Sequence, residues 1–76
     1  MNAERRKRIE KAVGMIADAR SILEDVTSDE QEAFDNMPES IQTSERGERM
    51  EEIIEMLEEA VSALEEVEGN LEEITS

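Results

Sequence analysis

Several residue types are missing or rare in this 76-residue chain. It has no Cys, His, Trp or Tyr, one Phe, one Pro and three Gly. Without Cys and His we expect no disulfide, no thiolate or imidazole metal site, and no catalysis by these side chains. No apolar run approaches the roughly 18 residues of a membrane span, and no signal-peptide core is found. We therefore expect a cytoplasmic chain with no membrane contact and no cofactor.

The chain is also short for a self-sufficient hydrophobic core. Its 76 residues allow one domain, and a chain of this size buries only about 60% of its unfolded surface. Scaffolds this small usually depend on a disulfide, a metal or a partner chain. Self-association is the source of stability that remains.

Basic residues are absent from the last third of the chain, and the net charge is −14. Residues 1–26 carry net +1, residues 27–50 net −5, and residues 51–76 net −10. Nucleic-acid backbones are bound by cationic groups that release counterions, so direct nucleic-acid binding is not expected. The acidic surface could instead resemble nucleic acid to a basic partner protein.

The one basic cluster, RRKR at residues 5–8, begins the first amphipathic segment. We interpret it as a helix end that lies beside the acidic residues Glu65–Glu73 of an antiparallel last helix. Binding to nucleic acid or another anionic surface is the alternative.

Two long segments have apolar residues at alternating intervals of three and four. This heptad spacing is typical of helices that pack along a seam. It predicts helices over about residues 3–26 and 44–74, with N-caps at Asn2 and at Thr43 or Ser44. The second half of the seam is Met50, Ile53, Leu57, Ala60, Leu64, Val67, Leu71 and Ile74, and the first half is Ile9, Ala12, Ile16, Ala19, Leu23 and Val26.

Further apolar residues, among them Val13, Met15, Ile22, Ile54 and Val61, widen both rows. Rows this wide need more than one neighbouring helix to cover them. The sequence therefore predicts an all-α fold: a helical hairpin of two long helices with a short helical connector, dimerising into an antiparallel four-helix bundle. A monomeric three-helix arrangement is the competing interpretation.

The segment between the long helices, about residues 28–43, breaks the heptad pattern. Thr27-x-x-Glu30 and Ser28-x-x-Gln31 are both capping-box patterns. They predict a bend near residues 26–28 and a short helix over about residues 29–36. Pro38 then ends that helix, because it disfavours helical angles at the preceding residue. The apolar side chains Phe34, Met37 and Ile41 form either a lid on the open end of the bundle or a docking patch for a partner.

The same segment contains a candidate ligand site. Arg46 lies at the positive end of the last helix, where anions are preferred, and Gly47 costs about 1 kcal/mol relative to Ala inside a helix. A helix N-terminus with these residues could hold the phosphate or carboxylate of a small anionic nucleotide. The alternative is a simple turn in which Arg46 pairs with a nearby carboxylate. The candidate residues are Asn36, Ser40, Gln42, Thr43, Ser44, Arg46 and Gly47.

Nothing in the chain indicates an enzyme. Glutamates repeat along the last helix and could gather Mg²⁺ or Ca²⁺, although a solvated helix face explains them more simply. Helical nucleotide pyrophosphohydrolases carry an E-x-x-E motif before an E-x-x-D motif. Here Glu52-x-x-Glu55 follows Glu32-x-x-Asp35, so the order is reversed. With no nucleophile–base pair and no P-loop, we expect no catalytic residue and no metal ligand.

Residues 30–42, EQEAFDNMPESIQ, are followed by SERGE at residues 44–48. This pattern resembles one found in small acidic helical proteins of phages and prophages, where it also lies between Glu-rich heptad segments. Those proteins have no known activity. The resemblance implies a viral accessory protein in the host cytoplasm that binds and neutralises a host protein, as anti-defence proteins do. Sequestration of a nucleotide immune signal, or a structural coiled-coil role in an assembling virion, are the alternatives.

Overall fold

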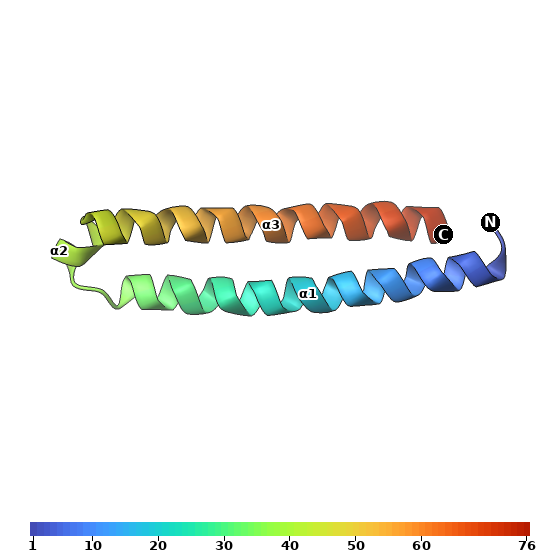
Figure 1. Ribbon diagram of the computed structural model, residues 1–76, viewed down its shortest axis with the longest axis horizontal. Coiled ribbons are helices and arrows are strands. Elements are labelled where there is room, and N and C mark those ends of the chain that lie inside the picture. The colour runs from blue at the N-terminus through green and yellow to red at the C-terminus, as the bar shows by residue number, and fades with distance from the viewer.

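The computed structural model describes residues 1–76 as an elongated helical hairpin (Figure 1). Helix α1 spans Ala3–Asp35, α2 spans Glu39–Gln42, and α3 spans Glu45–Thr75. The two long helices run antiparallel, and α2 lies at the closed end between them. The molecule measures 58 × 14 × 13 Å, so it is a narrow rod. The all-α hairpin with a short helical connector is confirmed.

Helix α1 is longer than the sequence predicted. The expected bend at residues 26–28 is wrong, because α1 continues without a break to Asp35. The hydroxyl of Thr27 does not cap a new helix but donates to the carbonyl oxygen of Leu23, at 2.7 Å. Inside a helix, the hydroxyl of Ser or Thr can bond in this way to a carbonyl oxygen one turn back instead of capping a new helix. The heptad spacing also continues through Glu30 and Phe34, which are half-buried, so packing favours an unbroken helix.

The helix starts agree with the prediction. The side chain of Asn2 accepts from the backbone N–H of Arg5 at 2.8 Å, and Ser44 caps α3 by accepting from the N–H of Gly47 at 3.4 Å. Pro38 lies between α1 and α2 in an extended conformation, with ψ at 146°. The chain therefore turns over residues 36–38, where proline ends the helix.

The connector is tied back onto the long helices by polar and backbone contacts. The side-chain amide of Gln42 donates to the carbonyl oxygen of Phe34 at 2.8 Å. In the first turn of α3, Gly47 lies against the end of α2. A Cβ atom there would come within 2.1 Å of the carbonyl oxygen of Gln42. No glycine has a positive φ, so close approach of the two backbones is what requires glycine at this position.

The seam between α1 and α3 includes the large apolar residues predicted for it, except Val26, Val67 and Ile74, which are exposed. The others are half-buried: Ile9, Ile16, Leu23, Met50, Ile53, Leu57, Leu64 and Leu71. The other residues facing α3 from α1 differ from the expectation. They are Val13, Arg20 and Thr27 rather than Ala12, Ala19 and Val26, which are exposed. On α3, the one buried hydrophobic residue is Ile54, with 5% of its surface exposed.

The basic start of α1 does not lie beside the acidic end of α3 as expected. Figure 1 shows the first turns of α1 extending past the C-terminal end of α3. The ion pair that joins the two helices is instead Arg20–Glu68, further along the hairpin. Antiparallel pairing places Arg20 level with Glu68, so the RRKR cluster at residues 5–8 lies beyond the end of α3.

Neither long helix has an apolar stretch of the length and hydrophobicity needed to cross a bilayer.

Candidate functional site

The most distinctive surface of the hairpin is an exposed apolar face. Met15 and Ile22 on α1 are 65% and 63% exposed, and Met56 on α3 is 60% exposed. Each belongs to a row with heptad spacing, and we call the two rows together the apolar face. It consists of the exposed residues Ala12, Met15, Ala19, Ile22 and Val26 on α1 and Met56, Ala63, Val67 and Ile74 on α3, together with Ile53 and Ala60, which are half-buried at the border with the seam.

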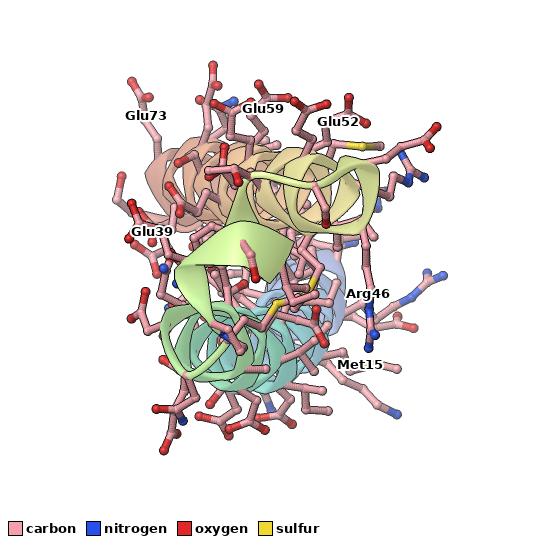
Figure 2. All side chains as sticks on the ribbon, turned by 90° about the vertical axis from the view of Figure 1, so that its left-hand side faces the viewer. Met15, Glu39, Arg46, Glu52, Glu59 and Glu73 are labelled. Atoms are coloured by element: carbon pink, nitrogen blue, oxygen red, sulfur yellow. The ribbon has the colours of Figure 1, made fainter.

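Helical geometry places both rows on the same side of the hairpin. On α1, Ala19 directly precedes the seam residue Arg20, and on α3, Val67 directly precedes the seam residue Glu68. One step back along a helix rotates the side chain by about 100°. Because the helices are antiparallel, the two rotations point to the same side. Figure 2 shows Met15 of α1 and Arg46, at the start of α3, on one side of the hairpin.

The opposite side of the hairpin is polar. There, Glu24 and Ser28 of α1 line a shallow depression with Glu58 and Ser62 of α3. A neighbouring depression includes Gln31, Glu51 and Glu55. The hairpin therefore has one apolar and one polar face, and only the polar face suits permanent contact with water.

Two charged residues in the seam were not predicted. The Arg20 guanidinium donates from Nε to one carboxylate oxygen of Glu68 at 2.5 Å and from Nη2 to the other at 3.3 Å. Its Nη1 donates to Glu24 at 2.5 Å. The hydrogen bonds to Glu68 and then Glu24 raise the pKa of Arg20 above its ordinary value, so it stays charged. The available signal was the opposite charge of two residues that directly follow Ala19 and Val67, which heptad spacing had assigned to the seam.

The outward surface of α3 carries a row of carboxylates. Figure 2 shows Glu52, Glu59 and Glu73 on the side of α3 away from α1, and Glu66 continues the same seven-residue spacing. All four are exposed. No three carboxylates in the molecule are grouped so that they could hold a metal ion.

In the predicted ligand site, most of the polar side chains bond within the connector. Gln42 binds the Phe34 carbonyl, Thr43 donates to the Glu39 carbonyl at 3.1 Å, and Ser44 donates to the Ile41 carbonyl. Gly47 is explained by its contact with α2. These contacts hold the turn together, so the structure assigns the residues a folding role without a ligand.

The remaining members of that site are exposed: Asn36, Ser40 and Arg46. Arg49, one turn further along, pairs with Glu52 at 3.0 Å, whereas Arg46 makes no ion pair with a carboxylate. A nucleotide site here stays a prediction.

The Phe34–Met37–Ile41 cluster lies at the closed end as expected. Phe34 and Met37 are half-buried, whereas Ile41 is exposed. Phe34 lines the polar-face depression together with Ile54. The lid and the docking patch both stay predictions.

Comparisons with protein-family models, with curated proteins and with solved structures find no match to this chain.

Proposed function

We propose that this chain is a non-enzymatic helical binding protein that acts as a homodimer. The observation that carries the proposal is the apolar face, which runs along both long helices and is open to water in a single chain. A second hairpin laid on this face would complete an antiparallel four-helix bundle. The rows that a single hairpin leaves exposed would then point into the bundle interior.

The solvent-accessible surface area of the chain supports the proposal that a second pair of helices packs on the hairpin. A compact monomer of this mass exposes roughly 4,700 Å², whereas this chain exposes 5696 Å². The excess of about 1,000 Å² is close to the roughly 800 Å² that each partner contributes to a standard protein interface. Only three of 76 residues are buried, and Ile54 is the one buried hydrophobic residue, so a single hairpin has almost no core.

The surface left outside such a bundle is strongly acidic. The row of Glu52, Glu59, Glu66 and Glu73 would repeat on both copies and present regularly spaced carboxylates. We propose that this surface binds a basic surface of a host protein, as an accessory protein of a phage or prophage would, and thereby neutralises it. Charge complementarity of this kind gives fast, salt-dependent association.

The binding proposal is tested by affinity capture from a host lysate. The bait is the wild-type chain, and the matched control replaces Glu52, Glu59, Glu66 and Glu73 with Gln, which keeps the shape but removes the charge. We expect a partner with a basic surface that is retained by the wild type, released by salt and not retained by the control. Equal capture by both baits would contradict a role for the carboxylate row.

A further inference from the structure

The charge distribution along the hairpin indicates how a second copy would be placed. Because Arg20 is level with Glu68, the hairpin divides at mid-length into a connector half, residues 24–64, and an open half, residues 1–23 with 65–76. The connector half has fourteen acidic and two basic residues, net −12. The open half has eight acidic and six basic residues, net −2.

Two-fold symmetry allows two arrangements on the apolar face. The connectors of the two copies lie either at the same end of the bundle or at opposite ends. The same-end arrangement places two −12 halves side by side, whereas the opposite-end arrangement places each −12 half against a −2 half. Self-repulsion of like charge therefore favours opposite ends.

The position of the positive charges supports the same choice. Arg5 and Arg8 precede the α1 row of the apolar face at the same heptad spacing, and both line one shallow depression with Ile9 and Ala12. Arg5 and Arg8 belong to the first turns of α1, which extend past α3 (Figure 1). Both are exposed and neither forms an ion pair in its own hairpin.

The positions of the α1 and α3 rows of the apolar face indicate where along the hairpin the two-fold axis would lie. The α1 row is centred on Ala19, and the α3 row is centred near Ala63, which is level with residue 25 of α1. An axis near Ile22 covers both rows most evenly. It places residues 5–11 of one copy level with residues 33–39 of the other, within the half of the hairpin that carries net −12.

We infer that the apolar face binds a second copy antiparallel to the first, with the basic N-terminal turns of each copy lying on the acidic connector end of the other. This inference rests on the homodimer proposed above and specifies its interface. The second copy covers the part of α1 that α3 leaves uncovered, and the ends of the two hairpins are level. Arg5 and Arg8 then lie against the strongly acidic half of the other copy, and not beside the end of α3 in their own hairpin.

Pulsed electron spin resonance distances test the arrangement. The chain has no Cys, so Ser40→Cys and Ala3→Cys each give one label per copy at an exposed position. Two labels at position 40 should be separated by close to the 58 Å length of the hairpin. A mixture of copies labelled at positions 3 and 40 should give a separation under about 25 Å, because packed helix layers lie roughly 10 Å apart.

A short distance between the two labels at position 40, in a particle with the mass of two chains, would overturn the antiparallel arrangement and leave the homodimer standing. A one-chain mass by light scattering would overturn the homodimer itself, and the arrangement with it.

A charge reversal sharpens the test. Arg5→Glu with Arg8→Glu should raise the dissociation constant of the dimer at least tenfold. The matched control, Arg6→Glu with Lys7→Glu, changes the charge equally on the other side of α1 and should have a clearly smaller effect. Equal effects of the two pairs would contradict the placement of Arg5 and Arg8 at the interface.

Discussion

Two neighbouring rows of side chains on α1 differ in polarity, one facing α3 and the other facing water. The difference is the reverse of the one expected of a stable monomer. The row that faces α3 includes Arg20 and Thr27, whereas the neighbouring row, exposed to water, contains only Ala, Met, Ile and Val. A helix normally turns its more apolar row toward its core. A single hairpin thus leaves an apolar row of α1 in water, which is the pattern expected if a second copy covers that row, as proposed above.

The largest loss of stability is expected in the seam. Ile54→Ala removes the one buried hydrophobic side chain and should lower the free energy of unfolding by about 2–5 kcal/mol, because it removes apolar contact and leaves a cavity. Urea unfolding followed by circular dichroism measures this. A loss below about 1 kcal/mol would show that the seam between α1 and α3 is not packed as described.

A smaller effect is expected where α2 contacts α3. Gly47→Ala places a Cβ against the backbone of Gln42 and should destabilise the protein by about 1–3 kcal/mol, as overpacking does. The matched control is Gly14→Ala, where nothing lies within 4 Å of the added Cβ. It should stabilise by up to about 1 kcal/mol through helix propensity.

The two glycine variants distinguish the effect of the close approach of α2 to α3 from the effect of helix propensity. If Gly47→Ala were as stable as Gly14→Ala, then α2 would not lie against the first turn of α3. Thermal unfolding of both variants at one protein concentration is sufficient to compare them.

The smallest net effect is expected at Arg20 and Glu68. Glu68→Leu alone should destabilise the protein, because it leaves the guanidinium in the seam without its two-point partner. The double variant Arg20→Leu with Glu68→Leu should recover most of that loss, since apolar residues replace a partly buried pair. A double-mutant cycle measures the coupling, and strictly additive effects would show that the pair does not interact.

Much of this fold follows from local sequence signals, and the exceptions have physical causes. Asn2, Ser44 and Pro38 mark helix ends through chemistry within a few residues, so these were predictable. Thr27 was misread because its hydroxyl can cap a helix or bind a carbonyl one turn back, and only packing of residues 30–34 decides between the two. Arg20 and Glu68 are polar, so a search for apolar periodicity passes over them.

The candidate site shows the same limit. The role of Gly47 depends on where α2 lies, which no short-range pattern specifies. The sequence identifies the residues of the exposed row, because Met15, Ile22 and the alanines have heptad spacing. It does not show that this row is exposed, because that depends on which of two adjacent rows faces α3.

The most direct test of the central claim is the mass in solution of two variants that differ by one position. Ile22→Glu places a charge in the exposed apolar row, and Ser21→Glu places the same charge on the adjacent residue outside it. Light scattering at micromolar concentration should give a two-chain mass for the wild type and Ser21→Glu, and a one-chain mass for Ile22→Glu, because burying an unpaired charge costs several kcal/mol. A two-chain mass for Ile22→Glu, or a one-chain mass for the wild type, would contradict a dimer formed through the apolar face.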